Sequence, residues 1–542
     1  MGFWAKSLLI FKCLCDKSPQ SIRQLAEQTG LAKSSVHRLK QAMERRDRHP
    51  ESWIWETEVG RRWLTRLVVA TLYTFGLKRG VGMDTMSEFF ARLRLEKQVG
   101  CSPSALRSVM HALERALLET AGTWEKDACA ADEVREIIGA VDETFLEQMM
   151  LVLMDLRTGY LLLEEVAEDR TYATWKAGVD ARLTALGTGV RYLVSDRAKA
   201  LIQLAEKGLE CLSMPDFFHC MHDLVKSSAL SLARHVRHAR QELTKAEGVL
   251  SKATGPAGWP PDDSEAQNRV EVKRAAVQRW EGVQSTYRDH LETISLTLHP
   301  FHLYDSSPQT SAQVHSRLHA EVAAMETLAQ AHAFPVHHDM LKKVRHQLPA
   351  LAALVDFWWA GVDQDLEQAT ISAPWRQWAR EALLPWVYWE HQVARTRCAR
   401  RKAKMQSAWA EVRSAFDQHV ITQRLAPHGL ADWKAWATEQ VTSFQRTSSA
   451  VEGRNGALAQ LHHNQRGLPK QRYKVWTVLH NFDCRAPDGT TPAVRFFRRT
   501  FPDLFETVLS QIEVLPRPRQ RKYHGGAKLL TSQQFPLMTC ES

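Results

Sequence analysis

Two aspartates stand where apolar runs of the sequence end. Asp142 follows the run at 136–141, and Asp196 follows the run at 190–194 together with Ser195. Clustered carboxylates raise each other's pKa unless a cation lies between them, and Mg²⁺ is a hard ion that prefers oxygen ligands. If the two aspartates lie side by side in the fold, the sequence therefore predicts a magnesium site between them. Each aspartate alone is also explained as a turn residue, or in the case of Asp196 as a helix cap.

The elements around these aspartates decide whether they meet. Apolar runs at 136–141, 149–156 and 160–166 predict three strands, the last two joined by the tight turn Arg157-Thr158-Gly159. A helix over 172–186, a strand over 190–194, a helix over 197–206 and a short strand over 211–213 follow. This β-β-β-α-β-α-β order is the ribonuclease H-like order, an α/β mixed sheet with helices on both faces. In that fold the first and fourth strands are neighbours, so Asp142 and Asp196 would meet at one edge.

A third acid stands in the segment Ser448-Ser449-Ala450-Val451-Glu452-Gly453-Arg454-Asn455-Gly456. Here the chain resembles the DDE transposases of the ribonuclease H-like superfamily, in particular the Mutator-like group and bacterial insertion-sequence transposases. The resemblance implies a catalytic triad of Asp142, Asp196 and Glu452 that holds two Mg²⁺ ions, for which Mn²⁺ can substitute. Ser449 and Glu452 also have the spacing of a capping box, and both interpretations can hold together. Glu439 is a rival third acid.

A further element follows the second aspartate, in the segment Pro215 to His222. Mutator-like transposases carry a Cys- or Asp-x-x-His element at this place, and Asp216-x-x-His219 resembles it. The resemblance places His219 near the catalytic edge. Zinc is the competing interpretation of Asp216, His219, Cys220 and His222, but no Cys/His group of suitable spacing follows to complete a tetrahedral site.

The N-terminal residues predict a helix-turn-helix. Ser18 and Pro19 are typical of a helix start, Ile22, Leu25 and Ala26 form one apolar face, and Gly30 supplies a turn before a second helix with Val36 and Leu39 at helical spacing. This segment resembles bacterial helix-turn-helix domains, although an ordinary helical hairpin is the alternative. In such a domain the second helix contacts DNA. Its exposed polar residues would be Lys33, Ser34, Ser35, His37 and Arg38.

A helical insertion separates the second and third acids. Residues 226–444 show little strand character and hold 11 of the 18 Trp, which favours a packed helical bundle. A basic run from Arg395 to Lys404 predicts a helix face for phosphate contacts, with Arg401 as one candidate. Arg454, beside the third acid, is another candidate DNA contact. The resemblance is to transposases with an all-helical insertion at this point.

Charge is concentrated at the two ends of the sequence. The 542 residues carry 71 Lys+Arg against 61 Asp+Glu, a net charge of +10. Residues 1–50 hold ten basic and four acidic residues, and residues 495–528 hold eight basic and three acidic ones, so the middle is near neutral. This pattern favours a nucleic-acid partner, although solvated basic tails are the alternative. The nine Cys are scattered, so we do not expect a secreted disulfide scaffold. The sequence has no apolar run long enough for a transmembrane helix, so we do not expect a membrane protein.

The predicted organisation has six parts: 1–60 helix-turn-helix, 61–135 helical linker or second DNA-binding or dimerisation unit, 136–225 first part of the catalytic core, 226–444 insertion, 445–485 last part of the core, and 486–542 basic tail. The resemblance implies a DNA transposase that cleaves transposon ends and transfers strands by phosphoryl transfer. It also implies double-stranded DNA as partner, a homodimer or higher homo-oligomer, and a cytoplasmic, nucleoid-associated place in a bacterium. A catalytically silent DNA-binding regulator and a ribonuclease H-like nuclease without strand transfer are the alternatives.

Overall fold

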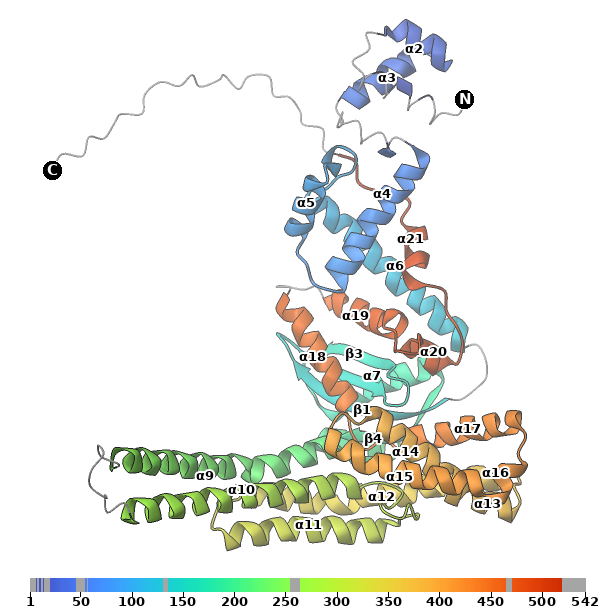
Figure 1. Cartoon of the computed structure of the whole chain (residues 1–542). Coiled ribbons are helices and arrows are strands. Elements are labelled where there is room, and N and C mark those ends of the chain that lie inside the picture. The colour runs from blue at the N-terminus through green and yellow to red at the C-terminus, as the bar shows by residue number, and fades with distance from the viewer. Residues whose placement is uncertain are drawn as a thin grey trace, which may run out of the picture. The chain divides into compact units, whose positions relative to one another are not determined.

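The computed structural model describes residues 20–44, 57–129, 135–253, 264–464 and 470–518, with Lys6, Leu9, Ile10, Cys13, Ile54 and Trp55 besides. The chain is mostly helical with one small mixed sheet. It divides into two compact units (Figure 1). Unit 1 comprises residues 1–122, 461–476 and 501–542, and unit 2 comprises residues 123–460 and 477–500.

The N-terminal part of unit 1 contains two short helices, α2 (Ile22–Thr29) and α3 (Lys33–Glu44). Ser21 and Gln24 form a capping box at the start of α2. Gly30 ends α2 with a φ of 62° while its N–H binds the carbonyl oxygen of Ala26, and such a left-handed position favours glycine. Leu25 of α2 and Val36 of α3 are buried in one small core with Ile10. The helix start expected at Ser18 and Pro19 lies outside the described residues.

The rest of unit 1 is built from further helices. Their bounds are α4 (Glu58–Thr71), the π-helical turn Leu72–Leu77, α5 (Met83–Arg92), the 3₁₀ turn Leu95–Lys97, α6 (Pro103–Cys129), α18 (Ser449–Asn464), α19 (Lys470–Asp483) and α21 (Leu504–Gln511), of which α6, α18 and α19 also extend into unit 2. The apolar stripe of α6, from Leu106 through Leu113 to Leu117, is buried. A buried ion pair between Glu114 and Arg472 joins α6 to α19 inside this unit.

Unit 2 is organised around a five-stranded sheet with the order β3-β2-β1-β4-β5. The strands are β1 (Arg135–Phe145), β2 (Met149–Asp155), β3 (Leu161–Ala167), β4 (Thr188–Ser195) and β5 (Leu212–Pro215), with α7 (Tyr172–Leu186), α8 (Lys199–Gln203) and the π-helical turn Leu204–Gly208 between them. β1 pairs antiparallel with β2 and parallel with β4. The predicted neighbourhood of the first and fourth strands is therefore confirmed.

Helices cover both faces of this sheet (Figure 1). α7 packs against β3 and β4. Ile138 and Ala140 of β1 instead belong to a large apolar core shared with the helices that follow β5. Because side chains alternate along a strand, Asp142 is on the same face as Ala140, while Glu143 is on the other face and accepts a hydrogen bond from Trp175 of α7.

The helices after β5 form the predicted insertion. They are α9 (Phe217–Ala253), α10 (Ser264–Thr297), α11 (Ser311–Ala331), α12 (His338–Gln368), α13 (Ala373–Trp378), the π-helical turn Ala379–Leu383, α14 (Leu384–Arg395), α15 (Ala399–Gln418), α16 (Val420–Arg424) and α17 (Pro427–Thr442). α9 and α10 run side by side as a long arm (Figure 1). Among the described Trp residues of the insertion, five are buried in the core, including Trp358, Trp378 and Trp389, and five more are partly buried and pack against it. None of the helices in the described part of the chain has the length and apolar character needed to cross a membrane.

Two expectations need correction. β1 does not end before Asp142 but continues to Phe145, because Asp142 and Glu143 still pair with Val152 and Leu151 of β2. The segment 486–542, expected as a basic tail, begins with the helices α20 (Pro492–Phe497) and α21. α20 is anchored by an apolar contact, since Phe496 stacks on Tyr160. The basic residues after Pro518 lie outside the described residues.

Candidate active site

Asp142 lies on β1 just beyond the end of its pairing with β4. The parallel pairing of β1 with β4 ends at Ala140 and Val194, two residues before Asp142. Burial, together with the negative charges of Glu452 and Asp196, raises the pKa of Asp142 to about 7, against the lowering influence of a backbone hydrogen bond and of His219. These electrostatic interactions fall off with distance. Glu452, Asp196 and His219 therefore lie close enough to Asp142 to influence its charge.

Asp196 directly follows Ser195, the last residue of β4. Its Oδ1 accepts a hydrogen bond of 2.8 Å from the backbone nitrogen of Ala198, so it also fixes the turn before α8, as the alternative interpretation suggested. Arg197, between them, has a φ of 64°, which is unusual for a residue with a side chain. Strained backbone of this kind persists where the surroundings hold it, often beside functional groups.

Glu452 occupies the first turn of α18. Its Oε1 lies 3.4 Å from Nε2 of His219, which is in the first turn of α9. The two side chains are about one third exposed, at 35% and 32%, so solvent reaches them. The structure therefore places His219 beside Glu452.

Asp216 holds the starts of α9 and α18 together. It is buried, and its carboxylate accepts hydrogen bonds from the backbone nitrogens of Phe218 and Ser448, at 2.8 and 3.2 Å, and from the Ser448 hydroxyl. Its own backbone nitrogen donates to the carbonyl oxygen of Ser195 at the end of β4. One buried residue, through its carboxylate and its backbone nitrogen, thus fixes the relative positions of the segments that carry Asp196, His219 and Glu452.

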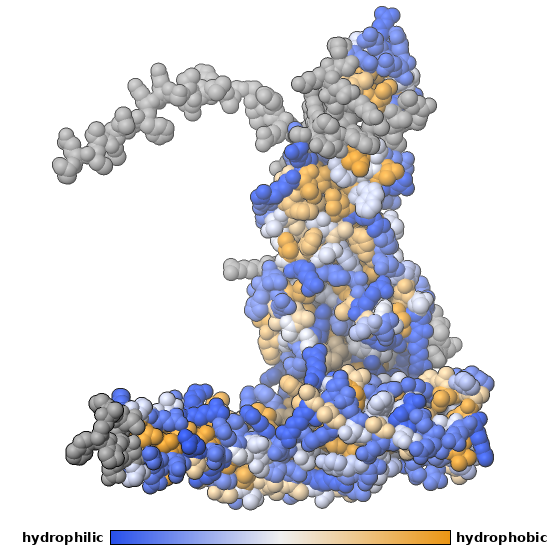
Figure 2. Space-filling view, viewed as in Figure 1, coloured by the Kyte–Doolittle hydropathy of each residue, from blue (hydrophilic) through white to orange (hydrophobic). Residues whose placement is uncertain are grey.

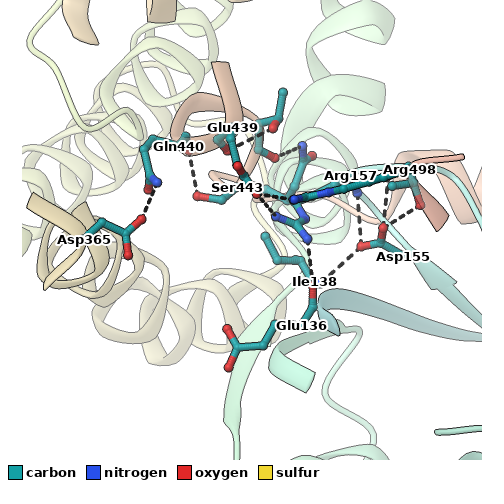
Figure 3. A network of polar contacts seen from close by, with 12 residues as sticks. Glu136, Ile138, Asp155, Arg157, Asp365, Glu439, Gln440, Ser443 and Arg498 are labelled. Carbon is teal, nitrogen blue, oxygen red and sulfur yellow. Dashed lines mark hydrogen bonds and ion pairs between the residues drawn. The ribbon is translucent and has the colours of Figure 1, made fainter. Parts of the chain in front are cut away.

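Glu439, the rival third acid, has other partners. It lies near the end of α17, where its Oε1 is 3.8 Å from Nη1 of Arg157 and accepts a hydrogen bond of 2.5 Å from Arg498. Figure 3 shows Arg157 between this glutamate and the strand β1, where it donates to the carbonyl oxygen of Glu136 at 2.7 Å. Glu439 therefore ties the insertion to the sheet, and Glu452 is the acid that faces Asp142.

The same network fixes the chain just before α18 (Figure 3). Ser443 donates from its hydroxyl to the carbonyl oxygen of Gln440, whose side-chain amide donates to Asp365 of α12 at 2.5 Å. The hydroxyl of the buried Tyr192, in β4, donates to the carbonyl oxygen of Ser443 at 2.8 Å. The segment that leads to Glu452 is thus bonded to the sheet and to the insertion.

Asn455 is a site residue that the sequence prediction did not select. Its Nδ2 donates a hydrogen bond of 2.8 Å to Oδ2 of Asp142, and its buried Oδ1 has no hydrogen-bond partner among the described residues. The available signal was its spacing, because residues three apart on a helix share a face and Asn455 is three residues after Glu452. Glu452 and Asn455 therefore place a carboxylate and an amide on the same face of α18.

Two predicted DNA contacts have internal roles instead. Arg454 is buried and forms two hydrogen bonds with Glu164 of β3, at 2.8 and 2.6 Å, which leaves its guanidinium no access to a phosphate. Arg401 donates to the hydroxyl of Ser295 in α10 at 2.7 Å. Its neighbour Arg400 is paired with Asp289, so the basic run of α15 is partly neutralised by acids of α10.

The side chains near Asp142 and Asp216 differ in their suitability as metal ligands. The thiol of Cys220 is buried and donates to Oε1 of Gln347 at 2.7 Å, and burial raises its pKa to about 12, so it is a poor zinc ligand. In the part of the chain that the structure describes, no three His, Cys, Asp or Glu side chains lie close enough to form a metal cluster as they stand. The donor types around Asp142, three carboxylates and the unpartnered amide oxygen of Asn455, nevertheless fit a hard divalent cation.

The predicted DNA-contact residues of the second N-terminal helix lie on its accessible side. Lys33, Ser34, His37 and Arg38 are exposed and Ser35 is half-buried, while Val36 faces α2. No carboxylate of the described residues pairs with Lys33 or Arg38. This face of α3 is therefore free to meet a polyanion.

Comparisons with known proteins agree with this part of the description. Residues 5–47 match the IclR helix-turn-helix domain, so the N-terminus carries a domain of a DNA-binding type, and DNA binding is indicated. Residues 379–524 match a second family, described as "Family of unknown function (DUF6399)". This match begins within the insertion, at the π-helical turn Ala379–Leu383, and includes Glu452, Arg454 and Asn455. A search of curated proteins gave no match.

Proposed function

We propose that this protein is a DNA transposase of the DDE type, which cleaves the ends of a mobile element and joins them to target DNA by phosphoryl transfer. One observation carries the proposal. Asn455 of α18 donates a hydrogen bond to the half-buried Asp142 of β1, and Asp216 bonds both to Ser195 at the end of β4 and to Ser448 just before α18, so the elements that carry the three carboxylates meet at one edge of a mixed sheet.

The chain order of these elements supports the same conclusion. The central strand β1 carries the first acid and its parallel neighbour β4 leads into the second, as in a ribonuclease H-like core. An all-helical insertion, α9 to α17, then precedes the third acid on α18. The helix-turn-helix supplies a separate element for holding DNA, which a reaction on DNA ends requires.

Each residue of the site has a role that follows from its contacts. Asp142, Asp196 and Glu452 would hold the divalent cations, Mg²⁺ or Mn²⁺. Such ions, when bound, activate water or a 3′-hydroxyl and stabilise the leaving oxygen of an in-line displacement. Asn455 holds the carboxylate of Asp142 by a hydrogen bond, and His219 restrains that of Glu452. Asp216 acts as a positioning residue through Ser448.

The test is a cleavage assay on DNA that flanks the gene. The full chain is incubated in Mg²⁺ or Mn²⁺ with a plasmid carrying both flanking segments, and nicks are mapped. We expect cleavage at discrete positions, lost in Asp142→Asn, Asp196→Asn and Glu452→Gln while DNA binding in a gel shift persists. Glu439→Gln is the matched control, because it removes a nearby acid that is bound to arginines, and it should cleave like the wild type.

The outcomes separate the alternatives. Absence of cleavage by the wild-type protein in either metal, with DNA binding retained, would favour a DNA-binding regulator. Cleavage without joining of pre-cut ends to a target plasmid would identify a nuclease. Loss of cleavage in Glu439→Gln but not in Glu452→Gln would overturn the assignment of the third acid.

A further inference from the structure

The helical arm of unit 2 carries an open groove away from the carboxylates. It lies between α9 and α10, has a volume of about 910 Å³, and is lined chiefly by the residues at 233–245 of α9 and by Gln284 and Arg288 of α10. At a rise of about 1.5 Å per residue, Arg237 is roughly 27 Å along α9 from His219. In Figure 2 the visible face of the arm is largely hydrophilic, with apolar patches between.

The charge of this groove is one-sided. Its lining includes four exposed cations, Arg237, Arg240, Lys245 and Arg288, and no acidic residue. Arg240 is paired with Glu281, and Lys245 with Glu242. Arg237 and Arg288, one on each helix, have no ion-pair partner among the described residues. The two helices therefore present two uncompensated guanidinium groups toward a shared opening.

The neighbouring groups fit a ligand with repeated anionic oxygens. Guanidinium groups bind phosphate through planar, paired donors, and the amides of Gln241 and Gln284 add neutral donors in the same lining. An open groove on a long, straight arm is suited to an extended ligand and leaves little of a small one enclosed. A DNA backbone has this shape, because it offers phosphates at regular spacing along a groove.

We propose that the α9–α10 groove binds the phosphate backbone of double-stranded DNA, at a distance from the carboxylate site and independently of base sequence. The inference takes its ligand from the proposed function, in which α9 starts beside the reacting centre and continues along the arm. The binding itself needs no cleavage and no metal ion.

The test measures DNA affinity as a function of salt. The full chain is titrated in EDTA with a fluorescent duplex of arbitrary sequence, about 40 base pairs long, and the slope of log K against log salt is determined. Each lost phosphate contact reduces that slope by about 0.9. We expect Arg237→Ala/Arg288→Ala to weaken binding equally for unrelated sequences and to reduce the slope by about 2. The control is Lys252→Ala/Arg269→Ala, which removes two exposed cations of the same helices outside the groove.

The results discriminate between the possibilities. A slope and an affinity like those of the wild type in a folded Arg237→Ala/Arg288→Ala protein overturn the proposal, and would leave an acidic protein partner for the groove. An equal loss in the control pair also overturns it, since the effect would then be one of overall charge. If the wild-type protein never cleaves DNA but Arg237→Ala/Arg288→Ala still reduces the salt slope, the DNA-binding role of the groove is supported although the transposase assignment fails.

Discussion

Asn455 on α18 donates a hydrogen bond of 2.8 Å to the carboxylate of Asp142 on β1. A hydrogen bond to the charged form of a carboxyl group lowers its pKa. We therefore expect Asn455→Ala to raise the pKa of Asp142 beyond its value of about 7. The stabilisation of the protein by Mg²⁺ in thermal unfolding should then need a higher pH than in the wild type. Gln460→Ala, an exposed residue of the same helix, should leave this pH dependence unchanged.

The raised pKa of Asp142 also affects stability directly. The folded protein binds the proton of the Asp142 carboxyl group more tightly than the unfolded chain does, because folding raises the pKa of this group from its ordinary value of 3.8 to about 7. The stability contributed by the protonated form is therefore complete below about pH 4 and is lost as the pH rises through about 7. Asp142→Asn cannot ionise. Relative to the wild type it should gain about 1–3 kcal/mol between about pH 5 and pH 8, at about 1.4 kcal/mol per pKa unit.

Urea unfolding of both proteins in EDTA at several pH values measures this difference. A difference in unfolding free energy that stays constant from acid to neutral pH would contradict the raised pKa. Mg²⁺ should reduce the advantage of Asp142→Asn at neutral pH, because a ligand that binds only the folded wild type stabilises it.

The buried pair of Arg454 and Glu164 predicts a large loss of stability when one partner is removed. Both side chains are almost fully buried, at 7% and 0% exposed. Arg454→Ala leaves a buried carboxylate, whose only other contact among those described is with the Thr477 hydroxyl. We expect a cost of about 3–5 kcal/mol, measured by urea unfolding. Arg397→Ala, at an exposed arginine, should change stability by less than about 0.5 kcal/mol. A similar small change in Arg454→Ala would contradict the internal role.

The helix-turn-helix predicts a salt-dependent contribution to DNA binding. Lys33→Ala/Arg38→Ala removes two exposed cations from α3 and should reduce the slope of log K against log salt by about 2. Arg62→Ala, at an exposed arginine of α4, serves as the control in the same titration. If the α3 variant keeps the full affinity for every duplex tested, the DNA-binding role of this face is wrong.

Parts of the fold were predictable because their signals are local. α7 has the predicted bounds, Tyr172 to Leu186, since Thr171 caps its start and Gly187 ends it in a left-handed conformation. The strands were found from their apolar runs. β1 was predicted too short because Asp142, Glu143 and Thr144 interrupt the apolar run, although the backbone continues to pair with β2.

The composition of the site was less predictable, since it depends on contacts between distant segments. Arg454 and Glu164 are 290 residues apart, and nothing in either neighbourhood indicates that the arginine is buried. The two partners of Glu439 also come from distant parts of the sequence, since Arg157 precedes the insertion and Arg498 follows it. Sequence patterns therefore offered candidate acids, and the contacts of each acid depend on the packing of distant elements.

The separation between Asp142 and Asn455, 313 residues, has a consequence for synthesis on the ribosome. Domains form as the chain emerges from its N-terminus, so the helix-turn-helix and the strands of the sheet are available long before α18. A nascent chain that ends within the insertion has two of the three carboxylates and no Glu452. The helix-turn-helix is therefore made well before the candidate catalytic centre, which is incomplete until α18 has been translated.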